Sequence, residues 1–320
     1  MRAMVVPQAG GPEVFELREL AEPEYGPYEL LVETLAVGVN FIETYQRSGV
    51  YRVDYPFIPG TEAVGRVVAV GAGVLNIEVG DRIATAAGRQ TYAGRFVVPY
   101  VDAARVPGSI DDVTAAAIPL QGCTAHYLAG DAAHPVAGDT VVVHAGAGGV
   151  GLILTQMLTA RGVRVLTTAS TDEKRALSLA AGAVESVPYE GFADRAREIT
   201  GGEGVAVVYD GVGLDTFDAS LSALRVRGEM VLFGGASGQV PPFDLQRLNA
   251  LGSLSITRPS LGAFMRNPGE REARYRELFA GVTKGELDFR VGVTFSLAEA
   301  AEAHRALESR ATTGKVVLLP

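Results

Sequence analysis

The sequence has 320 residues, 48% of them hydrophobic, so the chain can bury a sizeable core, and its length suggests two domains. Its 37 acidic and 28 basic residues give a formal net charge of -9, which argues against general affinity for nucleic acid or acidic membranes. No signal sequence and no apolar run of roughly 18 residues is found, so we expect a cytoplasmic protein that does not span a membrane.

The first part of the chain, to about Asp111, alternates short β-rich runs such as ELLVETLAVGV and GRVVAVG with Gly, Pro and Asp turn signals. This pattern predicts an antiparallel, barrel-like β domain. From Asp111 to about Ser260, an Ala-rich helical stretch is followed by strands that alternate with helices, including a helix expected over residues 215–228. Repeated strand–helix–strand units require parallel strands with right-handed crossovers, so we expect a doubly wound α/β sheet.

The chain ends in a charged helix, a strand, a second helix and a final strand, starting at about Asn267. We expect these two β segments to return to the first domain. The predicted boundaries are therefore 1–120 with 267–320 for a β-rich domain, and 121–266 for a Rossmann domain.

The sharpest local signal is a glycine motif in TVVVHAGAGGVGLILTQML, which follows a predicted strand and opens a predicted helix. Glycines at these positions allow a tight turn, close approach of the backbone to a pyrophosphate, and close helix packing, while the helix N-terminus attracts phosphate. The motif predicts a dinucleotide site at Gly146, Gly148, Gly149, Val150 and Gly151.

The next predicted strand ends at Ala169 and Ser170, without the carboxylate that NAD enzymes use to bind the ribose 2′-hydroxyl. Ser170, Thr171, Lys174 and Arg175 offer hydroxyls and cations that suit a 2′-phosphate. The sequence therefore favours NADPH over NADH.

Several separated segments can be compared with known families: GGPEVFEL, VGVNFIETYQRSGVY, PFIPGTEAVGRVVAVG, GDRI, AAAIPLQGCTAHYL, HAGAGGVG, VVYDGVG and TRPSL. In this order they resemble the zinc-independent NADPH:quinone oxidoreductases of the medium-chain dehydrogenase/reductase superfamily, the branch that includes zeta-crystallin. The resemblance covers essentially the whole chain. It implies a GroES-like catalytic domain beside the Rossmann domain, with a quinone reduced by NADPH in the cleft between them.

The resemblance also implies functional residues. Asn40 is expected near the nicotinamide, and Tyr45 and Tyr51 along the substrate site. The further cofactor-binding residues that it implies are Thr124, Lys174, Tyr189, Phe233, Gly234 and Arg258. Relatives pair the strand equivalent to GSLSITRP across a two-fold axis, so a homodimer is expected.

The zinc ligands of alcohol dehydrogenases are missing from this sequence. In the resembling segments Thr61 replaces a zinc-binding histidine, and Asn40 lies where a cysteine would be expected. Cys123 is the only cysteine, so a four-cysteine zinc site cannot form, and a small buried thiol is a better interpretation of it than a nucleophile. The histidines are scattered, and His144 is expected to be structural. We therefore expect no metal.

Hydride transfer to a quinone or an activated enone needs no Lewis acid, because the acceptor is already electron-poor. The protein must position the reactants, exclude water and donate a hydrogen bond to the developing oxyanion. Candidate residues are Asn40, Glu43, Tyr45 and Tyr51. The alternative is that Asn40 only caps a helix and that the tyrosines are ordinary half-buried aromatics.

Two other functions remain open from the sequence. One keeps the fold but changes the small-molecule acceptor to an α,β-unsaturated carbonyl compound or an enoyl thioester. The other is a crystallin-like protein that binds NADPH or RNA without useful turnover. The physiological acceptor, and whether reduction proceeds in one-electron or two-electron steps, are not determined by the residues.

Overall fold

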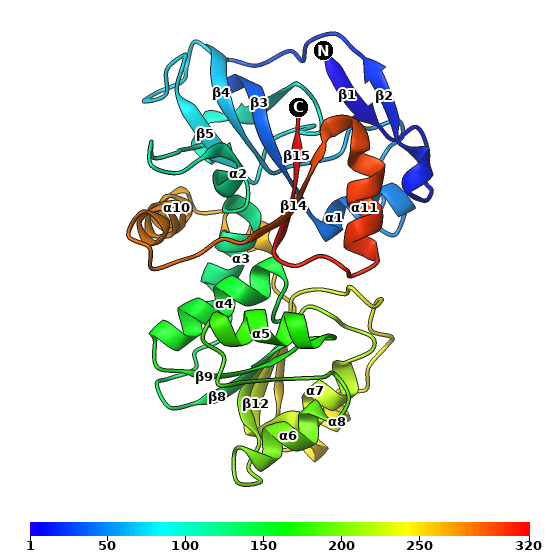
Figure 1. Ribbon diagram of the computed structural model, residues 1–320, viewed down its shortest axis with the longest axis vertical. Helices are drawn as coiled ribbons and strands as arrows, with labels where there is room; N and C mark the ends of the chain where they lie inside the picture. Colours follow the sequence, from blue (N-terminus) through cyan, green and yellow to red (C-terminus); the bar gives the residue numbers. More distant parts are fainter. The chain divides into compact units, whose positions relative to one another are not determined.

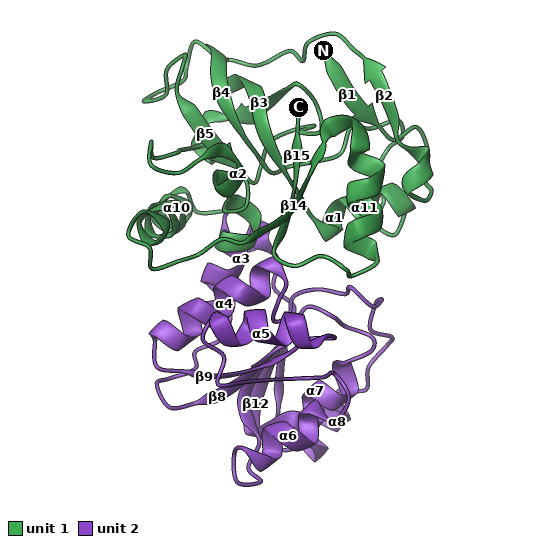
Figure 2. Cartoon of the chain, viewed as in Figure 1, with its two compact units in different colours: residues 1–122, 266–320 green, residues 123–265 purple.

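The computed structural model describes residues 1–320, which form two compact units. Unit 1 comprises Met1–Gly122 and Arg266–Pro320, and unit 2 comprises Cys123–Met265 (Figure 2). No helix is long and apolar enough to cross a lipid bilayer. Each unit has a sheet of its own, which is described separately.

Unit 1 is built on a seven-stranded sheet in which β6 also pairs with β3. The order of the other strands is β14-β15-β3-β4-β5-β7, and every pair is antiparallel except β14 with β15. The strands are β3 (Glu29–Val39), β4 (Ala63–Val70), β5 (Arg82–Thr85), β6 (Arg95–Pro99), β7 (Ala104–Arg105), β14 (Val291–Ser296) and β15 (Lys315–Leu319). A separate hairpin pairs β1 (Arg2–Val5) with β2 (Glu16–Glu19).

The C-terminal strand completes this sheet. β15 pairs with β3 so that Val317 lies opposite Gly38, and Figure 1 shows the red β15 beside the blue β3. Side chains from both ends of the chain, including Leu30, Val316 and Leu318, share one buried core. Burial of this apolar surface holds the C-terminal segment in unit 1.

The remaining elements of unit 1 are mostly short. They are α1 (Phe41–Ser48), α2 (Asp112–Ala115), α10 (Pro268–Thr283) and α11 (Ala300–Glu308), with short 3-10 turns at Pro12–Val14, Tyr100–Asp102 and Leu297–Glu299. Helix α1 follows β3 directly, begins after Asn40 and ends at Gly49, whose φ of 82° suits a residue without a Cβ. Helix α3 (Pro119–Gly130) starts in unit 1 and continues into unit 2.

Unit 2 is a six-stranded, fully parallel sheet of order β10-β9-β8-β11-β12-β13. Numbered from β8, this is the strand order 3-2-1-4-5-6 of a Rossmann fold. The strands are β8 (Thr140–Val143), β9 (Arg164–Thr168), β10 (Glu185–Val187), β11 (Val205–Asp210), β12 (Leu224–Leu232) and β13 (Ser255–Thr257). The expected doubly wound sheet beside a β-rich domain is confirmed.

Helices lie between these strands, and a last short helix, α9 (Leu261–Phe264), follows β13. The others are α4 (Gly149–Ala160), α5 (Asp172–Ala180), α6 (Phe192–Glu198), α7 (Phe217–Ala223) and α8 (Gln246–Ala250). The expectation of one helix over residues 215–228 is wrong in its second half, because α7 ends at Ala223 and β12 begins at Leu224. Pairing of Leu224 with Val205 in the sheet overrides the local helical preference.

Candidate cofactor site and buried polar clusters

The predicted glycine motif forms the connection between β8 and α4 in unit 2. A Cβ on Gly146 would lie 2.6 Å from the Cβ of Thr167, and one on Gly151 would overlap the carbonyl oxygen of Ala145. Ala145 itself has a φ of 52°, which turns the chain sharply. Gly148 is the N-cap of α4 and provides no side-chain hydrogen bond, so the first N–H groups of the helix are not capped by a side chain of that residue.

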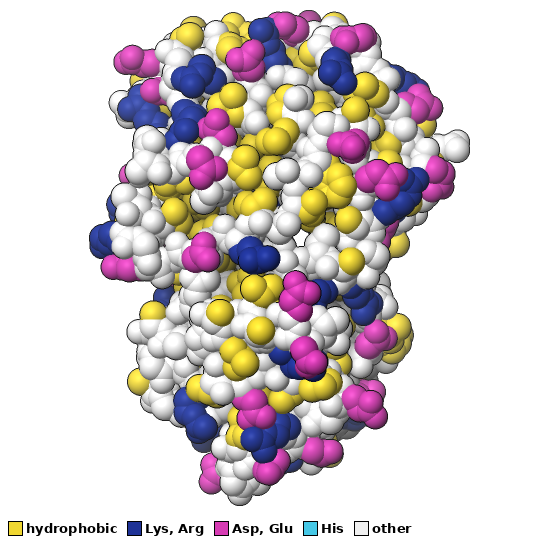
Figure 3. Space-filling model, viewed as in Figure 1, with side chains coloured by type: hydrophobic (Ala, Val, Ile, Leu, Met, Phe, Trp, Pro, Cys, Tyr) yellow, Lys and Arg dark blue, Asp and Glu magenta, His cyan; other side chains and the backbone are white.

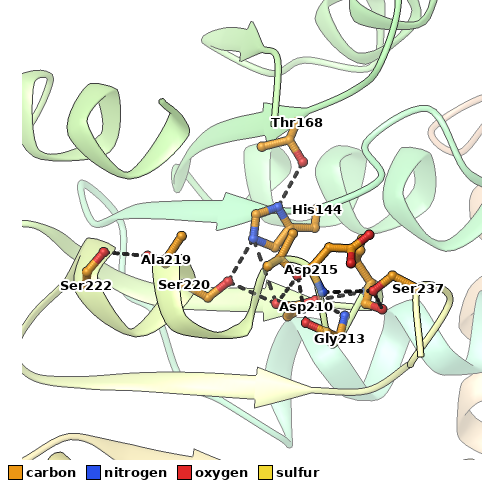
Figure 4. A network of polar contacts seen from close by, with 11 residues as sticks. His144, Thr168, Asp210, Gly213, Asp215, Ala219, Ser220, Ser222 and Ser237 are labelled. Carbon is orange, nitrogen blue, oxygen red and sulfur yellow. Dashed lines mark hydrogen bonds and ion pairs between the residues drawn. The ribbon is translucent and has the colours of Figure 1, made fainter. Parts of the chain in front are cut away.

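His144 holds this loop to its neighbours. Its ring nitrogens lie 2.8 Å from Thr168 Oγ1 and 2.9 Å from Ser220 Oγ, as Figure 4 shows. Because the Ser220 hydroxyl donates to Asp210, His144 Nε2 donates to Ser220 and Nδ1 accepts from Thr168. Burial lowers the pKa of His144 to about 4, so the imidazole is neutral at physiological pH. The histidine links the ends of β8 and β9 to α7.

Asp210 fixes the loop that follows β11. One carboxylate oxygen accepts hydrogen bonds from the N–H groups of Val212 and Gly213, at 2.8 and 2.9 Å. The other accepts from the hydroxyls of Thr216 and Ser220, at 2.7 and 2.9 Å (Figure 4). Both carboxylate oxygens are therefore fully engaged within the protein, which gives Asp210 a structural role.

His144, Ser220 and Asp210 do not form a hydrolytic triad, although the three residue types are present. In a triad the carboxylate binds the imidazole nitrogen opposite the serine, whereas here the serine lies between imidazole and carboxylate. All three side chains are buried. This cluster shapes the strand ends instead of attacking a substrate.

Five of the predicted positions in unit 2 follow the carboxyl ends of sheet strands. The glycine loop follows β8, Ser170 follows β9, Tyr189 follows β10, Phe233 follows β12 and Arg258 follows β13. Parallel strands have their carboxyl ends at one edge of the sheet, where ligands of open α/β folds bind. The structure thus places these residues along one edge, whereas Lys174 lies on α5 and Thr124 on α3.

Two cationic side chains, Arg175 and Lys174, follow the end of β9, where the adenosine part of the cofactor is predicted to bind. Arg175 donates to the carbonyl oxygen of Ala169 at 3.2 Å and pairs with Asp172, so its guanidinium is bound by the chain itself. Lys174 is partly buried on the first turn of α5, and burial lowers its pKa. Ser170 is exposed beside it, and no carboxylate ends β9. Lys174, on the first turn of α5 beside Ser170, is therefore a candidate for contact with a 2′-phosphate.

Tyr189 stacks on His144, with ring centroids 6.1 Å apart, which places it beside the glycine loop. Gly234 packs on the loop after β11, because a Cβ there would lie 2.9 Å from the Cα of Gly211. Phe233 contacts the same glycine and donates its N–H to the carbonyl oxygen of Asp210. These contacts bring the loops after β11 and β12 together.

In unit 1, Tyr45 and Tyr51 lie together. Their ring centroids are 5.3 Å apart, Phe41 lies 6.3 Å from Tyr45, and Tyr51 is 37% exposed. This is an aromatic surface that suits a flat apolar ligand.

Asn40, the N-cap of α1, is instead 5% exposed and belongs to a buried cluster. Its amide nitrogen donates to Glu62 Oε2 at 2.9 Å and to the carbonyl oxygen of Gly38 at 3.2 Å, while its oxygen accepts from Lys315 Nζ at 2.7 Å. Both N–H groups are thus used within unit 1. Asn40 therefore has no free side-chain donor to offer a ligand.

Glu62, Lys315 and Asp210 are polar residues that sequence reasoning missed. Each is fully buried and hydrogen-bonded. The available signal was a charged residue inside or beside an apolar strand, as in GTEAVG, TGKVVLLP and VVYDGV, because such residues are rarely buried without a partner.

Comparison with known proteins agrees with this geometry. A family model described as the alcohol dehydrogenase GroES-like domain matches residues 26–138, and one described as zinc-binding dehydrogenase matches residues 149–281. The chain is 42% identical to a quinone oxidoreductase of Pseudomonas aeruginosa over 317 residues, with 97% of each chain covered. The chain belongs to the quinone oxidoreductases of the medium-chain dehydrogenase/reductase superfamily.

Solved structures of this family include NADPH complexes. A mycobacterial protein complexed with NADPH is 49% identical with a TM-score of 0.98, and each chain is fully covered. The Escherichia coli quinone oxidoreductase complexed with NADPH is 39% identical with a TM-score of 0.98, again over both full chains. A 2-haloacrylate reductase of Burkholderia is 38% identical, covering 99% of this chain and 98% of its own. The family resemblance expected from the sequence is confirmed.

The residues of this quinone oxidoreductase do not fit a zinc ion, despite the description of one family model. The Asn40 amide is held by Glu62, Gly38 and Lys315, and the Lys315 ammonium is within 2.7 Å of the Asn40 oxygen. A cation bound there would meet the charge of the ammonium. No three side chains of His, Cys, Asp or Glu lie together in an arrangement able to hold a metal ion.

Proposed function

We propose that the chain is an NADPH-dependent quinone oxidoreductase that works without a metal. The observation that carries this proposal is the carboxyl edge of the unit 2 sheet. An uncapped glycine-loop helix and the side chains of Ser170 and Lys174 follow adjacent strands there, and no carboxylate ends β9. The NADPH complexes of relatives with the same fold support it.

The chain's own residues bind and orient the reactants. The N–H groups that begin α4 would hold the pyrophosphate, and Lys174 and Ser170 would hold the 2′-phosphate. NADPH, when bound, supplies the hydride. Tyr45 and Tyr51 offer an aromatic surface for the quinone ring, and Asn40, held by Glu62 and Lys315, is the proposed polar residue for the nicotinamide. Thr124, Tyr189, Phe233, Gly234 and Arg258 complete the proposed cofactor contacts.

Initial rates of NADPH and NADH loss, measured side by side, test this proposal. The acceptors are 1,4-benzoquinone, a naphthoquinone and an α,β-unsaturated ketone. Rapid loss of NADPH with a quinone, and slow loss of NADH, is the expected result. Tight NADPH binding with no turnover by any acceptor would instead support a protein that binds the cofactor without catalysis.

A second candidate function is reduction of an activated carbon–carbon double bond. It is favoured by the 38% identity with a 2-haloacrylate reductase over nearly the whole chain. A 2-haloacrylate added to the same assay distinguishes the two. Higher kcat/KM with the haloacrylate than with either quinone would make this the main activity.

We also propose that the protein is a cytoplasmic homodimer without affinity for nucleic acid. β13 is an edge strand that pairs only with β12, so a second copy can add its own β13 there. On the face shown in Figure 3, Lys and Arg side chains are interspersed with Asp and Glu, and a large basic patch is absent from that face. Light scattering coupled to size exclusion should give twice the mass of the chain, and a gel shift with RNA at low salt should show no complex.

A further inference from the structure

A buried charged cluster in unit 1 is made of Asn40, Glu43, Glu62 and Lys315, here called the Lys315 cluster. Glu43, Glu62 and Lys315 have no exposed surface. Lys315 Nζ donates to Glu62 Oε2 at 2.5 Å and to the Asn40 oxygen at 2.7 Å. Glu62 Oε1 accepts from the N–H of Leu120 at 2.7 Å. The cluster therefore links β15, the segment before β4, and the start of α1.

The strands around the Lys315 cluster leave room for it. Gly38 lies on β3 opposite Val317, and a Cβ at Gly38 would overlap Glu62 Oε2 and lie 2.7 Å from Lys315 Cε. Any larger residue at this position would displace the ion pair. A glycine at position 38 of β3 is therefore needed to make room for the Lys315 cluster.

Within the cluster the orientation of the Asn40 amide is determined. Its nitrogen donates to Glu62 and to Gly38, and its oxygen accepts from the Lys315 ammonium. A flipped amide would place N–H groups against the ammonium and oxygen against a carboxylate, which is electrostatically unfavourable. Lys315 and Glu62 together therefore determine which way the Asn40 amide is oriented.

Glu43 gives the cluster a second carboxyl group for a single ammonium. Its Oε2 accepts from the N–H of Asn40 at 2.5 Å, and its Oε1 is buried with no hydrogen-bond partner. Two carboxylates against one ammonium would leave an unbalanced negative charge away from water, which is costly. A protonated Glu43 makes the Lys315 cluster neutral overall.

The electrostatic surroundings of Glu43 are consistent with a bound proton. Burial raises the pKa of Glu43 to about 8, opposed by Lys315 and the Asn40 N–H and reinforced by Glu62. Tyr92 is the other titratable group that senses both carboxyl groups, and burial together with their charges raises its pKa. Arg47, one turn along α1, is bound to Glu308 at 2.6 Å, so that guanidinium is already paired.

We propose that Lys315 and Glu62 are positioning residues that orient the Asn40 carboxamide for the reaction, and that Glu43 must keep its proton for them to do so. The proposal rests on the proposed function only in placing Asn40 at the reactants. Loss of the Glu43 proton would put a second negative charge beside Lys315. The ammonium would then be drawn away from the Asn40 oxygen, and the amide would lose its fixed orientation.

NMR of the full chain tests this coupling without turnover. The protein is labelled with 13C at the glutamate side-chain carboxyl and with 15N at the asparagine side chain, and the Asn40 signal is assigned with Asn40→Ser. We expect one glutamate to titrate with a midpoint near 8 and the Asn40 side-chain signals to shift with the same midpoint. Both transitions should vanish in Glu43→Gln and persist in Glu33→Gln, a control at an exposed position on β3. Asn40 signals that stay fixed while Glu43 titrates would overturn the proposal.

The pH dependence of turnover supplies an independent test. kcat of the wild type should fall about tenfold per pH unit above the Glu43 midpoint, with little change in KM, and Glu43→Gln should lack this alkaline limb. Glu62→Gln should lose most of kcat, because the Lys315 ammonium then lacks its carboxylate partner and the Asn40 amide loses its charged acceptor. Glu62→Asp keeps the carboxylate and should retain more of kcat than Glu62→Gln. An identical alkaline limb in Glu43→Gln contradicts the proposal.

The two proposals fail in different ways. A wild type without NADPH-dependent turnover, but with coupled NMR titrations, would reject the proposed function and retain the Glu43–Asn40 coupling. Normal quinone turnover, with Asn40 signals that do not follow the Glu43 titration, would reject the Glu43–Asn40 coupling and retain the proposed function.

Discussion

In the proposed function, cofactor preference depends most directly on Lys174. It lies on the first turn of α5, beside the exposed Ser170 that follows β9. Lys174→Ala should weaken NADPH about 10- to 100-fold, the cost of losing a hydrogen bond to a charged group, and change NADH affinity by less than about threefold. Fluorescence titration of both cofactors measures this.

The control for this substitution is Lys284→Ala, which removes an exposed lysine of unit 1. It should leave both dissociation constants unchanged. Equal weakening of NADPH and NADH in Lys174→Ala would contradict the assignment of Lys174 to the 2′-phosphate.

Glu43 should make the stability of the protein depend on pH. Its pKa rises from 4.5 in the unfolded chain to about 8 in the fold, so the folded state binds more protons between these values. The stabilising contribution is complete below pH 4.5 and is lost as pH rises through 8, up to about 5 kcal/mol in total. Urea unfolding of wild type and Glu43→Gln at a series of pH values measures the difference.

Glu43→Gln has no proton to lose, so its stability relative to wild type should improve as pH rises from 5 to 8. Glu33→Gln, at an exposed position of the same sheet, should follow the wild-type profile. A constant difference between Glu43→Gln and wild type across this range would show that Glu43 titrates in its ordinary range.

At the scale of elements, the connection from β8 to α4 depends on glycine at close contacts. A Cβ on Gly151 would overlap the Ala145 carbonyl and lie 2.9 Å from the Cα of Gly146. Gly151→Ala should therefore cost about 1–3 kcal/mol of stability and weaken NADPH, because the loop must move. Gly262→Ala on α9, where nothing lies within 4 Å, is the matched control. Isothermal titration calorimetry measures the NADPH affinity of both variants. Weaker binding in Gly151→Ala alone supports the loop as the phosphate site, and equal affinities would contradict it.

The loop after β11 depends on a charged acceptor. Asp210→Asn replaces one carboxylate oxygen, which accepts hydrogen bonds, with an NH₂ group, which cannot accept them. In either orientation of the amide, this NH₂ group would face donors, which are two backbone N–H groups on one side and two hydroxyls on the other. We expect a loss of about 1–3 kcal/mol in the free energy of unfolding. Asp194→Asn, at an exposed position of α6, should change it by less than about 0.5 kcal/mol. Equal denaturation midpoints for the two variants would show that Asp210 is dispensable.

For the whole molecule, the sequence predicted what local patterns determine. The glycine motif and the alternation of strands and helices are short-range signals, and they led to the doubly wound sheet. The Lys315 cluster was not predictable in this way, because Lys315 and Glu62 are 253 residues apart and meet only when β15 joins β3. The helix expected over residues 215–228 was wrong for a related reason, since the pairing of Leu224 with Val205 is also a long-range contact.

In the candidate site, too, the sequence predicted what depends on short-range patterns and missed what depends on long-range contacts. Ser170, after β9, and Lys174, at the start of α5, could be predicted near the glycine loop because strand ends of a parallel sheet share an edge. The roles of Asn40, Tyr45 and Tyr51 came from family resemblance and remain predictions. Only the three-dimensional structure revealed that the Asn40 amide is already held by Glu62 and Lys315.

The central claim is a metal-free reduction of quinones by NADPH. Its most direct test is kcat/KM for NADPH and for NADH with 1,4-benzoquinone, measured on protein dialysed against a strong chelator. The account predicts that activity survives dialysis and that NADPH is preferred at least tenfold. Loss of activity that added zinc restores, or equal kcat/KM for the two cofactors, would contradict it.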